Sequence, residues 1–140
     1  MPTVKKRVLV IDDEPAVVAY LETLLGDHGY ETMSAENGRT GFEVAKREKP
    51  DLVCLDITMP EESGIKFYRQ LKADADLADT PVIVVTAVTG SGGDPEPFRH
   101  FLSSRKHVPP PEGFFSKPID QQEFLRAVAL VLERVGSGVR

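Results

Sequence analysis

The sequence is poor in the features that mark secreted, membrane and nucleic-acid-binding proteins. It has a single cysteine, Cys54, so no internal disulfide can form, which is consistent with a reducing cytoplasm. No apolar run approaches the length of a membrane span, and the first residues do not resemble a signal peptide. A net charge of −5 at pH 7 provides no basic face for nucleic acid. We therefore expect a cytoplasmic protein that binds neither nucleic acid nor a membrane.

The 140 residues suit a single domain in which apolar stretches alternate with helical patterns. Short apolar runs closed by turn residues predict strands at 7–11, 31–35, 51–56, 81–86 and 113–116. Apolar residues at helical spacing predict helices that begin near Pro15, Thr40, Ile65 and Asp120. Asp13 is a candidate cap for the first helix, and Asp120 with Glu123 forms a capping box for the last.

Strands that alternate with helices indicate right-handed crossovers and a parallel sheet covered on both faces. Five repeats in this length predict an α/β fold, a flavodoxin-like (βα)5 three-layer sandwich with a five-stranded parallel sheet. Residues 88–113 break the pattern, because glycine and proline recur there and end in Pro109-Pro110-Pro111. Such a composition disfavours one long helix, so we expect an irregular fourth helix region with a short helix near Pro95.

Polar side chains close four of the predicted strands. They are Asp12 and Asp13 after the first strand, Asp56 after the third, Thr86 at the fourth and Lys117 at the fifth. Taken alone, Asp56 is better explained as a turn or capping residue. The carboxyl ends of parallel strands meet at one edge, however, so three carboxylates, a hydroxyl and an ammonium should converge there. Mg²⁺ would relieve the repulsion among the carboxylates, and an aspartate is a competent nucleophile towards phosphorus.

These positions, in this order and at strand ends, resemble the receiver domain of two-component response regulators. The resemblance covers about residues 6–135 and implies that residues 1–140 form a single receiver domain without an effector domain. It implies that Asp56 accepts a phosphoryl group from a sensor histidine kinase or a histidine phosphotransfer protein. It also implies Mg²⁺ held by Asp13, Asp56 and the backbone carbonyl of Thr58, with Asp12 helping through water.

The resemblance further implies a switch. Thr86 and Lys117 would hold the phosphoryl oxygens, and Phe114 would turn into space that Thr86 vacates, which alters the surface of the fourth helix, fifth strand and fifth helix. Lys117-Pro118 resembles the Lys-Pro bond of the family, which is often cis. The output would pass to a downstream protein that the sequence does not identify, or through a homodimer.

The interval between Thr86 and Lys117 is longer than is usual in that family. One interpretation is an added surface loop, which costs little stability. The other is a partner-binding surface that carries Phe98, Phe101 and Leu102. The basic residues Lys5, Lys6 and Arg7 are interpreted as a solvated start of the first strand.

Two other functions are compatible with a strand-end aspartate, Mg²⁺ and lysine. A phosphohydrolase of the haloacid-dehalogenase type needs a second aspartate two positions after the nucleophile, and Thr58 occupies that position. We therefore expect no turnover of a separate substrate. The second alternative is a receiver that serves only as a protein-binding module, which nothing in the sequence requires.

Overall fold

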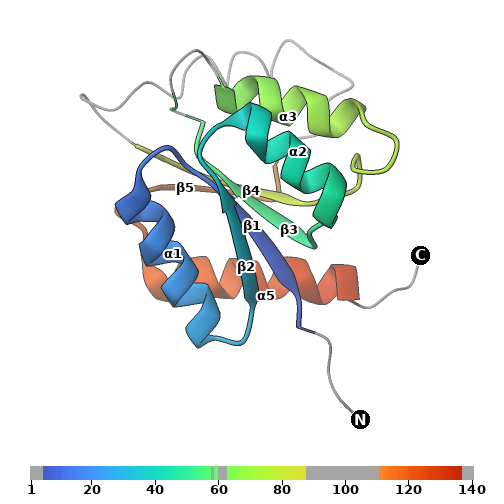
Figure 1. The fold of residues 1–140 in the computed structure, drawn as a ribbon. Helices are drawn as coiled ribbons and strands as arrows, with labels where there is room; N and C mark the ends of the chain where they lie inside the picture. Colours follow the sequence, from blue (N-terminus) through green and yellow to red (C-terminus); the bar gives the residue numbers. More distant parts are fainter. Residues whose placement is uncertain (1–4, 58, 60–62, 88–110, 137–140) are drawn as a thin grey trace.

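The computed structural model describes residues 5–57, 59, 63–87 and 111–136, and Figure 1 shows how their helices and strands are arranged. The elements follow one another as β1 (Arg7–Ile11), α1 (Pro15–Asp27), β2 (Glu31–Ala35), α2 (Gly38–Glu48), β3 (Leu52–Leu55), α3 (Ser63–Ala73), β4 (Val82–Ala87), β5 (Gly113–Lys117) and α5 (Gln121–Gly136). All five predicted strands are confirmed. The short helix predicted near Pro95 lies outside the described residues.

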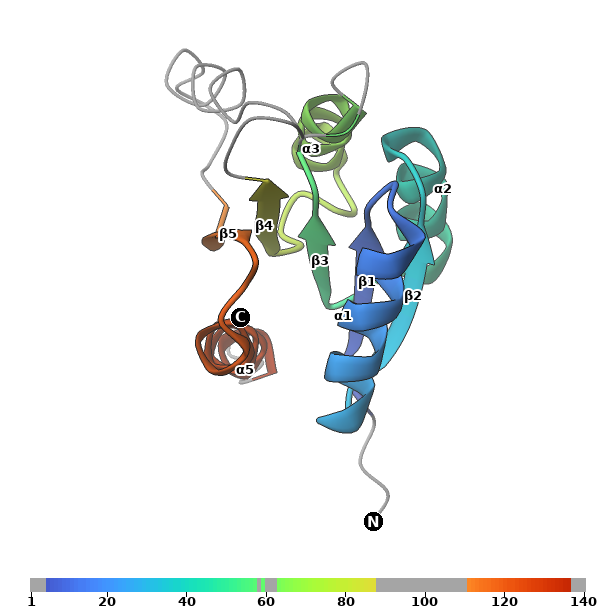
Figure 2. The same cartoon turned by 90° about the vertical axis from the view of Figure 1, so that its left-hand side faces the viewer.

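The strands form one parallel sheet in the order β2-β1-β3-β4-β5. Helices α1 and α5 cover one face and helices α2 and α3 cover the other, as Figure 2 shows. The predicted three-layer α/β sandwich is therefore confirmed. Among the described residues, no helix is both long enough and apolar enough to cross a membrane.

The buried residues of the central strands β1, β3 and β4 are apolar because helices cover both faces of the sheet there. In β1, Val8 and Val10 pack toward α1 and α5, whereas Leu9 and Ile11 pack toward α2 and α3. Cys54 is buried in β3, and this burial raises the pKa of its thiol to about 12. It therefore serves as a small core residue, as expected.

The starts of three helices test the capping assignments. The prediction for Asp13 is wrong: Glu14 is the residue that precedes α1, its side chain makes no capping hydrogen bond, and Pro15 begins the helix. At α5, Asp120 accepts a hydrogen bond from the Glu123 N–H at 3.0 Å, as predicted. Helix α2 begins two residues earlier than predicted, because the Asn37 side chain caps it through the Thr40 N–H at 2.8 Å.

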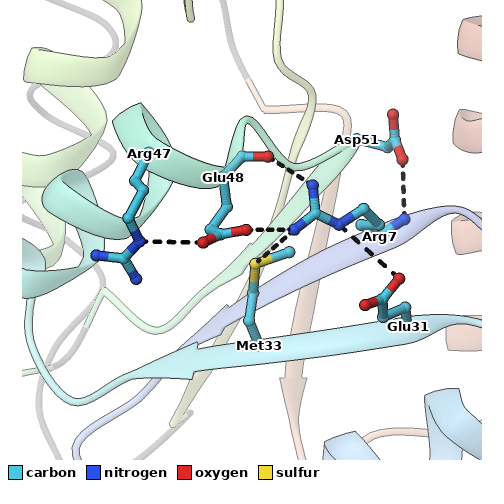
Figure 3. Close-up of polar contacts among 6 residues, drawn as sticks. All are labelled: Arg7, Glu31, Met33, Arg47, Glu48 and Asp51. Atoms are coloured by element: carbon cyan, nitrogen blue, oxygen red, sulfur yellow. Dashed lines mark hydrogen bonds and ion pairs between the residues drawn. The ribbon is translucent and has the colours of Figure 1, made fainter.

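Arg7 is not the solvated residue that its basic neighbours suggested. Figure 3 shows its guanidinium between β2 and the end of α2, where it donates to the carboxylate and the backbone carbonyl of Glu48. Its backbone N–H donates to the Asp51 carboxylate at 2.8 Å. These partners are more than 40 residues away in sequence. Arg7 thus ties the start of β1 to the segment that leads into β3.

Gly64 lets helix α3 approach the chain that follows β3. A Cβ at this position would lie 2.6 Å from the Asp56 carbonyl oxygen and 2.7 Å from the Ile57 Cα. Both neighbours are backbone atoms, so no side-chain movement could relieve the clash. The absence of a side chain at Gly64 therefore helps to fix the backbone at Asp56.

Gly64→Ala should lower the free energy of unfolding by about 1–3 kcal/mol, because overpacking would push α3 away from the Asp56 backbone. Chemical denaturation monitored by circular dichroism measures this change. The matched control is Gly26→Ala in α1, where an added Cβ meets nothing within 4 Å. That variant should be as stable as the wild type or more stable by about 0.5–1 kcal/mol. Equal stability of the two variants would contradict the close approach.

Candidate functional site

Two aspartates occupy equivalent places at the carboxyl ends of the neighbouring strands β1 and β3. Ile11 and Leu55 are direct partners in the sheet, and Asp12 and Asp56 follow them. At both aspartates, a backbone hydrogen bond continues the strand pairing for one residue beyond the end of the strand. The Asp12 N–H donates to the Ala35 carbonyl at 3.2 Å, and the Asp56 N–H donates to the Ile11 carbonyl at 3.0 Å. Sheet register therefore places these two carboxyl groups side by side.

Asp13 completes the acidic cluster. One carboxylate oxygen from each of Asp12, Asp13 and Asp56 can be chosen so that all three lie within 4.8 Å of one another. The side chains of Asp12 and Asp56 are only 2% and 3% exposed, whereas Asp13 is exposed to solvent. Oxygen donors at this spacing suit a hard divalent cation such as Mg²⁺. The three residues predicted as metal ligands by their side chains do therefore converge.

Lys117 brings a positive charge to the cluster from β5. Its Nζ lies 3.1 Å from Asp12 Oδ2, within hydrogen-bond distance, and 3.7 Å from Asp56 Oδ2. Its side chain is 20% exposed, so the ion pairs are largely shielded from water. The Lys117-Pro118 peptide bond is cis, as the sequence suggested. The convergence of Lys117 with Asp12 and Asp56 agrees with the prediction from strand ends.

The charges in the cluster act on one another. Burial, followed by the nearby Asp56 carboxylate, raises the pKa of Asp12 from 3.8 to about 6, although hydrogen bonds from the Glu14 N–H and Lys117 oppose the rise. For Lys117, burial favours a lower pKa, but Asp56, Asp12 and Glu14 outweigh it and the net pKa is raised. Lys117 is therefore held as an ammonium in a site that is short of positive charge.

Sequence reasoning missed Glu14. Its carboxylate lies 3.4 Å from Lys117 Nζ, although its side chain is 64% exposed. The signal that could have identified it is the acidic run Asp12-Asp13-Glu14, which places a third carboxylate just after the first strand. The chain distance between Glu14 and Lys117 hides this contact, because only the sheet topology brings the end of β5 near the start of α1.

The other predicted site residues are only partly described. Thr86 lies in β4 and is paired with Ser116, but its side chain lies outside the described part of the structure. Thr58, the predicted source of a backbone carbonyl for the metal, also lies outside the described residues. Phe114 is half-buried in β5 and packs on the core cluster between the sheet and helices α2 and α3. The roles of these three residues remain predictions.

This arrangement suits the transfer of an anionic group onto a carboxylate. A buried aspartate lies beside a lysine ammonium, and two more carboxylates can share a cation with it. The ammonium of Lys117, together with a divalent cation held by the carboxylates, would offset the charge that builds up during transfer of a phosphoryl group. The geometry therefore supports a phosphoryl-accepting site better than a purely structural ion pair.

Comparison with known families and curated proteins yields concordant matches. Residues 8–96 match the response regulator receiver domain family. The chain is 35% identical to the protein PilH of Pseudomonas aeruginosa, over 90% of this chain and 97% of PilH. It is 32% identical to the polar-differentiation response regulator DivK of Brucella anthropi, over 88% of this chain and 93% of DivK.

A solved structure supports the same relation. The signal receiver domain of a signal transduction histidine kinase from Syntrophus aciditrophicus superposes with a TM-score of 0.77 at 29% identity. The superposition covers 96% of this chain and 92% of that domain. The family match ends at residue 96, so it does not include Lys117. The ion pairs of Lys117 with Asp12 and Asp56 supply independent evidence for its place in the site.

Asp12 predicts a pH dependence of stability in metal-free buffer. Its pKa in the folded state is raised to about 6, so the folded protein keeps the proton over a range in which the unfolded chain loses it. Its contribution to stability therefore falls as the pH rises from about 4 to 6, by at most about 1.4 kcal/mol per pH unit. Asp12→Asn cannot titrate and removes this fall.

The free energy of unfolding of Asp12→Asn minus that of wild type should therefore rise between pH 4 and pH 6, and level off above pH 6. Urea denaturation at several pH values measures this difference. Asp27→Asn, at the exposed end of α1, is the control for replacing an aspartate by asparagine outside the acidic cluster. A difference that stays flat for Asp12→Asn would contradict the raised pKa.

Proposed function

We propose that this chain, which belongs to the family of response regulator receiver domains, accepts a phosphoryl group on Asp56. The main support is the position of Asp56: it is a buried carboxylate, 3.7 Å from the ammonium of Lys117, in a cluster with two further carboxylates. Phosphoacceptor function is a property of the family. What we add is the assignment of the acceptor and its supporting residues in this chain.

The contacts of the three aspartates favour Asp56 as the acceptor. Both carboxylate oxygens of Asp12 accept hydrogen bonds, Oδ1 from the Glu14 N–H at 3.0 Å and Oδ2 from Lys117 at 3.1 Å. Asp13 is exposed and makes no ion pair with Lys117 among the described contacts. Asp56 is buried, and its Oδ2 lies 3.7 Å from Lys117 Nζ. A phosphoryl oxygen on Asp56 would thus be within reach of the ammonium.

The donor in this proposal is a phosphohistidine on a sensor histidine kinase or a histidine phosphotransfer protein in the cytoplasm. A carboxylate oxygen of Asp56 attacks the phosphorus, an O–P bond forms, and the N–P bond of the donor breaks. The imidazole leaves with both bonding electrons and is protonated. Lys117 neutralises charge on the phosphoryl oxygens as they approach Asp56.

The donor set fits Mg²⁺ as the cofactor. Asp12, Asp13 and Asp56 supply carboxylate oxygens within 4.8 Å of one another, and we expect the Thr58 carbonyl to join them. When bound, Mg²⁺ would offset the repulsion of the carboxylates and polarise the phosphoryl group for attack. The exposed carboxylate of Asp13 lies at the solvent side of the cluster, where a hydrated cation can enter.

The reporting surface is proposed on the same basis. Phe114 lies three residues before Lys117 on β5, so a change at the acceptor site is transmitted to it along one short strand. Its half-buried ring lies against the core cluster on the α2 and α3 face. Movement of Thr86 toward the phosphoryl group would allow this ring to turn. The surface that includes β5 and α5 would then present the change to a partner.

The chain belongs to the receiver family, whose members are signalling modules. This membership does not favour the phosphohydrolase alternative. We propose that the chain does not turn over a separate substrate, because Thr58 cannot act as the general acid that such an enzyme needs. Turnover of small phosphate esters would support the phosphohydrolase instead.

Incubation with acetyl phosphate and Mg²⁺ should add one phosphoryl group to the wild type, as measured by intact-mass spectrometry. Asp56→Asn should remain unlabelled, because an amide is a poor nucleophile and cannot form an acyl phosphate. The control Asp27→Asn, at an exposed position on α1, should be labelled like the wild type. Chelation of Mg²⁺ should suppress labelling. Equal labelling of Asp56→Asn and wild type would overturn the assignment of the acceptor.

A further inference from the structure

Glu14 occupies a helix-capping position without capping the helix. It precedes Pro15 with an extended backbone, φ −102° and ψ 111°, and its side chain makes no capping hydrogen bond. Glutamate is not among the residues favoured at this position, where a shorter polar side chain would bond the backbone. The carboxylate instead lies 3.4 Å from Lys117 Nζ, at the end of β5. Helix capping therefore does not explain this side chain.

The backbone of Glu14 is fixed independently of its carboxylate. Its N–H donates to Asp12 Oδ1 at 3.0 Å, and its carbonyl accepts from the N–H groups of Val17 and Val18. The side chain is 64% exposed, and an ion pair this exposed contributes little to stability. A substitution that changes only the charge should therefore leave the fold intact. Because the contact with Lys117 contributes little to stability, we look for its role in the chemistry of the site.

Lys117 has three carboxylate neighbours and three N–H donors. The Nζ distances are 3.1 Å to Asp12, 3.4 Å to Glu14 and 3.7 Å to Asp56. The side chains of Asp12 and Asp56 are buried, so they cannot move away from Lys117 without disrupting the packing around them. Glu14 is the exposed neighbour, so it can turn into solvent at little cost. A phosphoryl oxygen that needs a donor from Lys117 would displace Glu14 most easily.

We propose that Glu14 is a positioning and specificity residue that restrains phosphorylation of Asp56. In the unphosphorylated protein, its carboxylate accepts a hydrogen bond from the Lys117 ammonium, which occupies an N–H group that a phosphoryl oxygen would need. In the phosphorylated protein its negative charge faces the phosphoryl oxygens and repels them. The same charge at the open side of the site disfavours small anionic phosphodonors. This inference rests on the proposed function, because it assumes that the phosphoryl group is carried by Asp56.

The test compares Glu14→Gln with wild type. Gln keeps the size of the side chain and removes its charge. At low salt we expect labelling by acetyl phosphate to be about three to ten times faster in Glu14→Gln, since one unit of repulsion near the phosphoryl group is removed. The acyl phosphate of the variant should also decay more slowly. Intact-mass spectrometry over time measures both rates.

The matched control is Glu43→Gln, which makes the same charge change at an exposed position on α2. This variant should be phosphorylated at the wild-type rate. A faster rate in it would show that net charge alone, rather than the position of Glu14, causes the effect. Raising the ionic strength should narrow the gap between Glu14→Gln and wild type, because exposed charges are screened. A change of structure would not respond to salt in this way. Thermal unfolding of both variants should remain close to wild type.

The outcomes separate this inference from the proposal on which it rests. If wild type labels at Asp56 but Glu14→Gln matches its rates at low salt, the role of Glu14 is overturned and the acceptor assignment stands. A rate gain of the same size in Glu43→Gln would also overturn it. If the wild type acquires no label that depends on Asp56, the proposed function itself is overturned.

Discussion

The register of β1 against β3 is the constraint on which the rest of the site depends. Ile11 and Leu55 are partners in the sheet, so the residues that follow them, Asp12 and Asp56, must lie side by side. Both side chains are almost completely buried, and the raised pKa of Asp12 reflects that burial and the neighbouring charge. Two buried carboxylates in this arrangement require positive charge, which Lys117 supplies in part. A divalent cation would supply the remainder.

The core of the site could be predicted from the sequence because it follows from topology. Apolar runs followed by Asp12, Asp56 and Lys117 identify three strands, and the carboxyl ends of parallel strands meet at one edge of the sheet. No knowledge of side-chain geometry is needed for that step. The same reasoning does not fix distances. It could not show that Lys117 lies nearer to Asp12 than to Asp56, which follows from packing.

Other features could not be predicted because they join residues that are distant in the sequence. Arg7 reads as a basic, solvated residue until folding brings Glu48 and Asp51 to it. The sequence around Gly64 does not indicate the close approach of α3 to the Asp56 backbone. Glu14 belongs to the acidic run that follows the first predicted strand, and only folding brings its carboxylate to Lys117. In each case a contact made only in the folded protein, rather than local sequence preference, determines the role.

The central claim is that the phosphoryl group is carried by Asp56 as an acyl phosphate. Reduction of the phosphorylated protein with borohydride converts an aspartyl phosphate into homoserine, which peptide mass spectrometry can locate. Our account predicts homoserine at position 56 and at no other aspartate, with Asp12 and Asp13 unchanged. Homoserine at Asp12 or Asp13, or a phosphate that resists reduction as an ester would, would contradict it.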